Sequence, residues 1–218
     1  MHHFHGIHGG AIVYNFNRRK QYATALTQLA RHALADGNAM EAKELLLKAL
    51  VFPHNLGEGK LEGQKDNNIY YYLGIAEQAL GNDAAGKAYL ERAAEGDEEP
   101  ASMMYYNDQP ADMILYQGLA NRALGRPERA NSRFFKLISY GEKHYYDQVK
   151  IDYFAVSLPD LQLFEDDLTA RNRAHCEFLI GMGSFGMGDF ARAKKCYDAA
   201  LSIDCGNQSV VLYRTMIR

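Results

Sequence analysis

The chain lacks tryptophan and has only three cysteines among its 218 residues. Without tryptophan, the 15 tyrosines and 10 phenylalanines must fill the large packing positions of a core. Cys176, Cys196 and Cys205 form no C-x-x-C pair and cannot all pair with one another. We therefore expect a cytoplasmic protein with reduced thiols, in which the cysteines are small core or near-surface residues.

Long apolar runs are also missing. None approaches the roughly 20 residues that a membrane span requires, and the N-terminal MHHFHGIHGG has no apolar segment of a secretion signal. The formal net charge is −3 with acidic and basic residues intermixed, so no basic stripe indicates nucleic acid. We expect neither a membrane nor nucleic acid as a partner, and a disordered or tag-like start over residues 1–16.

The common catalytic signatures are absent as well. GEGK at residues 57–60 lacks the spacing of a phosphate-binding P-loop, so we interpret it as a flexible polar turn. The chain has no H-E-x-x-H zinc motif and no G-x-S-x-G nucleophile elbow. These absences predict a chain that is not an enzyme and that has no metal or cofactor.

What the chain does have is one pattern repeated four times. A small residue is followed seven positions later by a glycine, then by a second small residue and a bulky one, five and nine positions after that glycine. The four sets are Ala30, Gly37, Ala42 and Leu46; Gly74, Gly81, Gly86 and Leu90; Gly118, Gly125, Ala130 and Phe134; and Gly181, Gly188, Ala193 and Tyr197.

This pattern predicts antiparallel helical hairpins. The central glycine ends the first helix in a left-handed conformation, and the small residues permit close crossing of the two helices. We expect the bulky residue to fill the space toward the next hairpin. Asn38, Asn82 and Asp189 suit the start of the second helices, and Pro127 serves there as a first-turn proline. The expected helices cover about residues 18–35, 39–51, 68–80, 83–95, 111–124, 127–140, 143–154, 169–187, 190–203 and 207–217.

On these residues the chain resembles the tetratricopeptide repeat (TPR) family, whose repeat is 34 residues long. The resemblance implies an all-α fold, a right-handed α-α superhelix of about four hairpins with a C-terminal capping helix, forming one domain over residues 17–218. The glycines are 44, 44 and 63 residues apart, which implies insertions between repeats. The hairpins lie near 22–52, 67–96, 111–141 and 174–204, and the insertions near 53–66, 97–110 and 142–168.

In TPR proteins, positions on the first helix of each repeat line a concave groove that binds a partner. By register, the resemblance implies that this chain uses a mixed polar and aromatic set. The set lacks the Lys, Asn and Arg cluster by which some members clamp a C-terminal carboxylate. The groove positions are Thr27, Arg31, Asn68, Tyr71, Asp112, Leu115, Arg122, His175 and Phe178.

The inserted YYNDQP admits two interpretations. Asn107, Asp108 and Pro110 favour a turn between helices, with Gln109 held extended before the proline. Tyr105 and Tyr106 are less well explained by a turn, because tyrosine is enriched at interfaces. We therefore include Tyr105, Tyr106, Asn107, Asp108 and Gln109 among the candidate partner-binding residues.

The inserted segments, such as NLGEGKL and YGEKHYYDQVKIDYFAVSLPD, also resemble the C-terminal repeat region of large uncharacterised bacterial proteins. Those proteins have an N-terminal β-rich region similar to carbohydrate enzymes. The resemblance implies a scaffold that binds a protein or another domain of its own parent chain. Two alternatives stay open: an accessory domain that contributes to sugar recognition, and a structural module that associates with itself as a homodimer.

Overall fold

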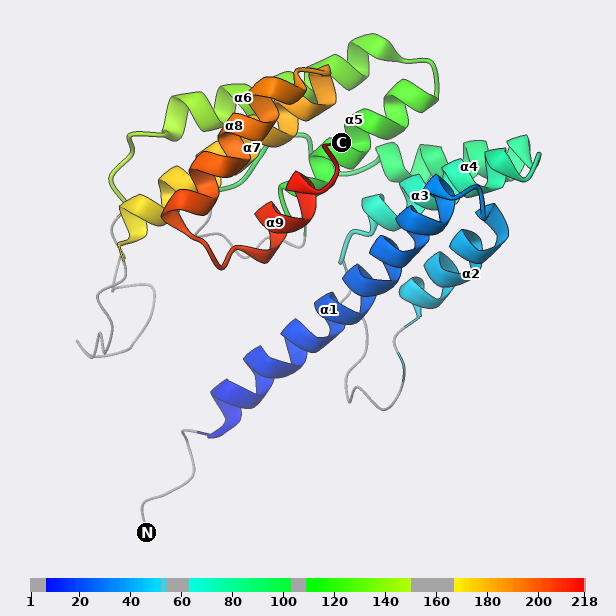
Figure 1. Ribbon diagram of the computed structural model, residues 1–218, viewed down its shortest axis with the longest axis horizontal. Helices are drawn as coiled ribbons and strands as arrows, with labels where there is room; N and C mark the ends of the chain where they lie inside the picture. Colours follow the sequence, from blue (N-terminus) through cyan, green and yellow to red (C-terminus); the bar gives the residue numbers. More distant parts are fainter. Residues whose placement is uncertain (1–6, 52, 54–62, 103–108, 150–166, 218) are drawn as a thin grey trace. The chain divides into compact units, whose positions relative to one another are not determined.

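The chain is all-α in the computed structural model, which describes residues 7–51, 53, 63–102, 109–149 and 167–217, with side chains from residue 21 onward. These residues contain nine helices and no strand (Figure 1). Helices that follow one another in the sequence pack together. The prediction of an all-α fold is therefore confirmed.

The chain divides into two compact units. Unit 1 comprises residues 1–96 and 119–126, and unit 2 comprises residues 97–118 and 127–218. The boundary passes through one helix, between Gly118 and Leu119.

Unit 1 is built from two helical hairpins and the second half of a further helix. The first hairpin is α1 (Ile7–Ala35) and α2 (Ala39–Leu50), and the second is α3 (Asn67–Ala79) and α4 (Asp83–Ala94). Besides the pairing within each hairpin, α3 packs against both α1 and α2. The end of α5 (Asp112–Ala123) completes the unit by contributing Ala120 to a core cluster with Leu90.

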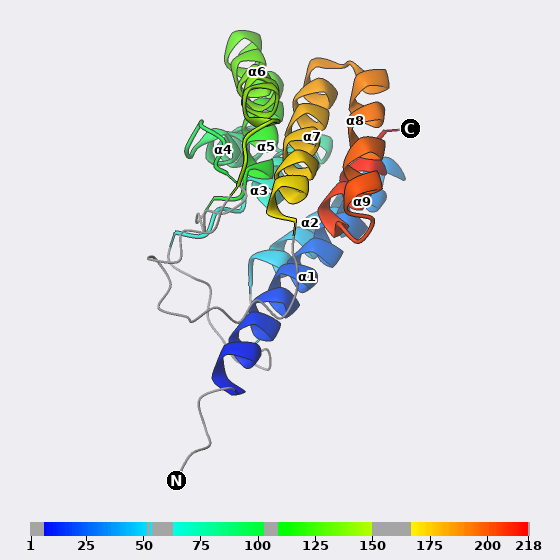
Figure 2. The same ribbon diagram turned by 90° about the vertical axis from the view of Figure 1, so that its left-hand side faces the viewer.

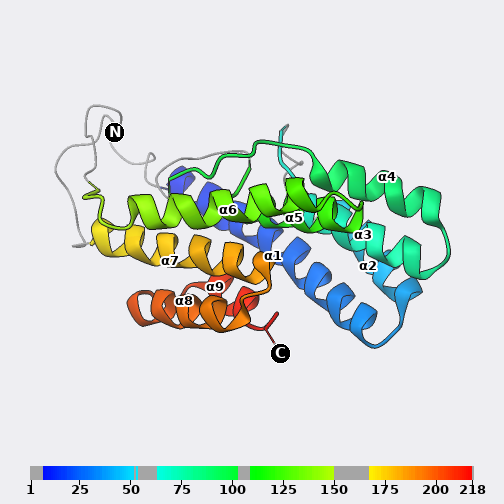
Figure 3. The ribbon, with the colours of Figure 1, turned by 90° about the horizontal axis from the view of Figure 1, so that it is seen from above.

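Unit 2 begins with the first half of α5 and continues through α6 (Pro127–His144), α7 (Leu168–Met187) and α8 (Phe190–Ile203). The rods α6, α7 and α8 lie side by side in sequence order (Figures 2 and 3). A two-turn helix, α9 (Gln208–Arg214), follows and packs on α8. Unit 2 is therefore a layer of antiparallel helices closed by a short terminal helix.

The hairpin turns form as the repeated glycine predicts. Gly37, Gly81, Gly125 and Gly188 have φ values of 81°, 78°, 73° and 86°, which is the left-handed region. The chain therefore reverses direction at positions where the backbone conformation would be strained for any residue with a side chain. Asp189 is the N-terminal cap of the helix after the last of these turns, and its carboxylate accepts a hydrogen bond from the backbone N–H of Arg192 at 3.0 Å.

Small residues bring the two helices of a hairpin into contact, also as predicted. A Cβ atom built on Gly74 would lie 3.1 Å from the carbonyl oxygen of Gly86, and one built on Gly86 would lie 3.0 Å from that of Gly74. Backbone therefore faces backbone where α3 and α4 cross. Any larger side chain here would push the two helices apart.

The bulky residue fills space in two directions, of which we predicted one. Leu90 and Tyr197 face the glycine of their own hairpin, Gly74 and Gly181. Leu90 also packs with Ala120 of α5, toward the next hairpin as predicted. Phe134 likewise does both, since its ring meets Gly118 of its own hairpin and Gly186 of the following helix. The reason is geometric: a helix pair this close leaves a hollow over each glycine that only the facing helix can fill. Phe134 and Tyr197 are fully buried, as expected of a core without tryptophan.

Several helix bounds differ from those expected. Helix α1 begins at Ile7 and not near residue 18, since no proline interrupts the stretch between them. Helix α6 continues to His144, so the separate helix expected over residues 143–154 does not begin there, and residues 145–149 are not helical. The rest of that expected helix lies outside the described residues. The carboxylate of Asp167 caps the start of α7, accepting from the N–H of Ala170 at 2.8 Å.

Candidate functional site

In unit 1, the predicted groove residue Tyr71 lies at the edge of a small apolar core, here called the Tyr71 cluster. Burial raises the pKa of the Tyr71 hydroxyl to about 12, and the neighbouring Tyr72 adds to the shift. The positive charge of Arg122, which is itself exposed, opposes it. Two residues predicted from different repeats are thus brought within electrostatic reach of each other. The cluster consists of Leu90, Ala93 and Ala120, with Tyr70, Tyr71, Ile75, Ala94 and Leu124 packed against them.

An arginine and two tyrosines that the groove prediction did not include lie beside this cluster. The Arg92 side chain donates a hydrogen bond to the Tyr70 hydroxyl at 2.6 Å, and its Cζ atom lies 4.0 Å from the centroid of that ring. The Tyr89 ring stacks against Tyr70 at 6.3 Å between centroids. The signal was present in the sequence as the run Tyr70-Tyr71-Tyr72, but the role of Arg92 depends on α4 lying against α3.

The remaining predicted groove residues of unit 1 differ in accessibility. Thr27 is only 2% exposed and its hydroxyl donates to the carbonyl of Ala23 at 2.7 Å, so it is engaged within its own helix. Arg31 is half-buried and lies 3.4 Å from the His32 ring nitrogen. Asn68 is half-buried on α3. Arg31, Asn68 and Tyr71 are therefore the accessible members of this set in α1 and α3.

In unit 2, Asp112 and Phe178 are brought together on one surface, here called the α5–α7 face. It consists of Asp112 and Tyr116, which are one turn apart on α5, and of Phe178 on α7. Leu115, also predicted as a groove residue, is fully buried. The face is occupied by Tyr213 of α9, whose hydroxyl donates to the Asp112 carboxylate at 2.9 Å. We did not predict this contact, because 101 residues separate its partners in the sequence.

In unit 2, the side chains of His175 and Gln109 both form hydrogen bonds with the backbone of a loop. The Gln109 side chain accepts from the N–H of Asp97 at 2.9 Å and donates to its carbonyl at 2.5 Å. His175 Nε2 lies 3.1 Å from the carbonyl of Ala101, and burial lowers the pKa of its ring. Both residues were predicted to bind a partner, and both have hydrogen bonds within the chain.

These contacts answer part of the question that YYNDQP raised. Gln109 is 7% exposed and clamps the start of the inserted segment to its end. Tyr105, Tyr106, Asn107 and Asp108 lie outside the described residues. Their predicted role in recognition stays a prediction.

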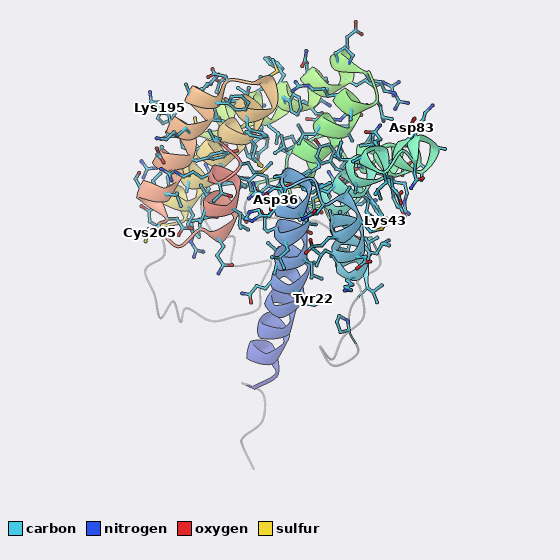
Figure 4. All side chains as sticks on the ribbon, turned by 45° about the vertical axis from the view of Figure 1, so that its right-hand side comes forward. Tyr22, Asp36, Lys43, Asp83, Lys195 and Cys205 are labelled. Atoms are coloured by element: carbon cyan, nitrogen blue, oxygen red, sulfur yellow. The ribbon has the colours of Figure 1, made fainter. Side chains whose placement is uncertain are left out.

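An open apolar groove of about 610 Å³ lies on the first hairpin of unit 1. Figure 4 places Tyr22 of its lining on α1. Leu47 and Val51, which are 40% and 65% exposed, form its apolar wall from the end of α2. We did not predict this groove from the sequence, although its signal was an apolar pair spaced four residues apart at the end of a helix. The lining residues are Tyr22, Glu44, Leu47, Lys48, Val51 and Pro53.

The described residues contain no group of three or more His, Cys, Asp or Glu side chains that could hold a metal ion. All three cysteines are free, with Cys205 exposed in the turn after α8 (Figure 4). Burial raises the pKa of the Cys176 and Cys196 thiols to about 12, which keeps them protonated and unreactive.

Within the described ranges, no helix has both the length and the apolar character needed to cross a membrane. No protein-family model matches the sequence.

Proposed function

We propose that this chain is a TPR-type scaffold without catalytic activity that binds a protein segment, or another domain of its parent chain, through its first-helix surfaces. The observation that supports this most is the repeated pairing of a small residue with a bulky one. Gly74 with Leu90, Gly118 with Phe134 and Gly181 with Tyr197 are three copies of one helix crossing. Equivalent crossings in series are what builds the concave, partner-binding surface of a helical-repeat protein.

The Tyr71 cluster is the proposed contact site in unit 1. Tyr71 is half-buried, so its ring is held in place by the cluster while part of it meets solvent. Arg122 is exposed and adds a positive charge nearby. Tyrosine and arginine are both enriched among the residues that dominate the binding energy of protein interfaces. The site therefore suits an extended or helical protein segment that carries a carboxylate.

The proposal is tested with the intact chain and a matched pair of variants. Proteins captured by the wild-type chain from a lysate of its source cells are identified, and the leading one is purified. Its Kd is then measured by calorimetry against wild type, Tyr71→Ala with Arg122→Ala, and a control in which exposed Tyr146 and Lys87 are replaced by alanine. We expect the first variant to bind at least tenfold more weakly and the control to bind as wild type does.

Two outcomes would contradict the proposal. If the Tyr71 and Arg122 variant keeps its helical circular dichroism and binds unchanged, the Tyr71 cluster is not the contact site. If no purified protein binds but a glycan array gives saturable binding, the accessory role in sugar recognition replaces the protein scaffold. Light scattering of the wild-type chain alone tests the remaining alternative, a homodimer.

A further inference from the structure

The α5–α7 face is filled by the chain's own terminal helix, and it is filled in a specific way. Tyr213 is 6% exposed, and its ring meets Phe178 edge to face at 5.2 Å between centroids. The Tyr116 ring lies on another side of it, 6.2 Å away. The hydroxyl at the tip reaches the Asp112 carboxylate. The face therefore recognises both the apolar body and the polar end of one tyrosine.

The rest of α9 is held weakly. The helix has seven residues, and its packing with other helices is mainly on α8. Its polar contact with α8 joins Arg214 to Asp198 at 2.5 Å, but both side chains are more than 40% exposed. Exposed ion pairs contribute little stability, and an isolated helix of two turns is unstable in water. Release of α9 therefore requires the loss of few contacts beyond those of Tyr213 and Val210.

The two neighbouring valines of α9 show which side of this helix is buried against the rest of unit 2. Val210 is fully buried, whereas Val211 is 46% exposed. Val210 and Tyr213 are three residues apart, so they lie on one face of the helix. An arginine at the next position, Arg214, meets the acidic Asp198. The bound segment thus has the pattern aliphatic-x-x-Tyr-Arg in a helical conformation.

We propose that α9 is a displaceable occupant of a helix-binding site on the α5–α7 face, and that the partner which replaces it is a helix with this same pattern. Occupation by α9 covers the apolar face until such a partner competes for it. The proposal rests on the proposed scaffold function and names a ligand class for its unit 2 surface. It does not involve the Tyr71 cluster, so the two can fail independently.

The test uses the chain truncated after Gly206 and a fluorescent peptide of residues 207–218. We expect saturable binding by fluorescence anisotropy, and at least tenfold weaker binding to the full-length chain, where α9 competes. Val210→Ser in the peptide should weaken binding at least tenfold, while Val211→Ser should change it less than twofold. Asp112→Ala in the truncated chain should also weaken binding, because the acceptor for the tyrosine hydroxyl is lost.

Two results would overturn the proposal. One is a truncated chain that unfolds cooperatively yet does not bind the peptide; the other is equal binding by the truncated and full-length chains. Hydrogen exchange of the full-length chain keeps the proposal testable if the truncated chain does not fold. We expect α9 amides to exchange at least a hundredfold faster than the protected amides of α7 and α8. Exchange of α9 only with global unfolding would show that it is a permanent part of the core.

Discussion

Gly181 of α7 lies directly against the ring of Tyr197 of α8, where a Cβ atom on the glycine would come within 2.5 Å of the ring carbon Cε1. Both residues are buried, and Tyr197 is among the largest fully buried side chains of the described residues. The ring cannot move aside without disturbing its neighbours, which include Phe178 at 6.1 Å between centroids. This pair is the clearest example of the helix crossing on which the fold depends.

The first prediction concerns this pair. Alanine in place of a helical glycine gains about 1 kcal/mol of helix propensity, but a forced methyl group in a packed core costs about 1–3 kcal/mol. We expect the clash to prevail, so Gly181→Ala lowers the free energy of unfolding in urea by about 1–2 kcal/mol. The control is Gly206→Ala, where a Cβ atom would have its nearest neighbour at 3.7 Å.

A double-mutant cycle shows whether the ring is the cause. The first hairpin has Ala30 and Leu46 at the positions of Gly181 and Tyr197. In a Tyr197→Leu background, Gly181→Ala should therefore be less destabilising by about 1 kcal/mol. An unchanged effect of the alanine in that background would show that the two positions do not interact.

The second prediction compares two buried tyrosine hydroxyls. The Tyr197 hydroxyl is buried without a hydrogen-bond partner among the described residues, and burial raises its pKa. Tyr197→Phe should therefore raise the free energy of unfolding, by about 1 kcal/mol. Tyr213→Phe should lower it by about 1–2 kcal/mol, because that hydroxyl donates to Asp112. Equal thermal shifts in the two variants would contradict this.

The third prediction concerns the stability of unit 1 in acid. The Glu77 side chain is 5% exposed and forms an ion pair with Lys43 at 2.8 Å. Hydrogen bonds from Lys43 and from Asn82 lower the pKa of the Glu77 carboxyl below its usual 4.5. The folded chain therefore binds this proton less readily than the unfolded chain, so the stabilisation is present above pH 4.5 and is lost as the pH falls through the folded pKa.

This loss is measured by urea unfolding between about pH 6 and pH 3. Glu77→Gln should flatten the decline seen in wild type, whereas Glu128→Gln, at an exposed position on α6, should leave it unchanged. Lys43→Met should destabilise the chain at neutral pH by about 1–3 kcal/mol, since it leaves the buried carboxylate with fewer donors. Parallel pH curves for wild type and Glu77→Gln would refute the assignment.

The fourth prediction concerns the clamp in unit 2. Gln109→Ala removes both hydrogen bonds to the backbone of Asp97. Because the freed backbone groups lie in a partly buried site, we expect a loss of about 1–3 kcal/mol in thermal or urea unfolding. Gln148→Ala, at an exposed position, serves as the control and should change stability by less than about 0.5 kcal/mol. Gln109→Ala should also speed proteolytic cleavage near residues 97–102, and an unchanged cleavage rate would argue against a clamp.

Much of the fold could be predicted because its signals are local. The glycine at each hairpin turn is in the conformation that its place in the pattern predicts, and Asp189 caps the start of α8 as expected. Helix ends are less predictable, since α1 and α6 continue past their expected bounds where no proline stops them. The direction in which the Phe134 side chain points was harder still to predict, because its ring meets glycines on two different helices.

The candidate site was predicted less completely than the fold. Register placed Tyr71 and Arg122 among the binding residues, and they do lie within electrostatic reach of each other. The same register also selected Thr27, which is buried, because a helical position determines which way a side chain points but not what covers it. Gln109 was selected for its place in a polar loop, and only the fold shows that its amide bonds to Asp97.

By itself, the sequence determined that helices form, where they reverse and which small residues line each crossing, because spacing along a helix and the backbone freedom of glycine act within a few residues. Only the tertiary structure decided which residues distant in the chain meet. The hydroxyl of Tyr213 finds the carboxylate of Asp112 across 101 residues because the packing of α7, α8 and α9 carries it there. No spacing rule reaches that far, since such a contact depends on the summed geometry of every helix between its two partners.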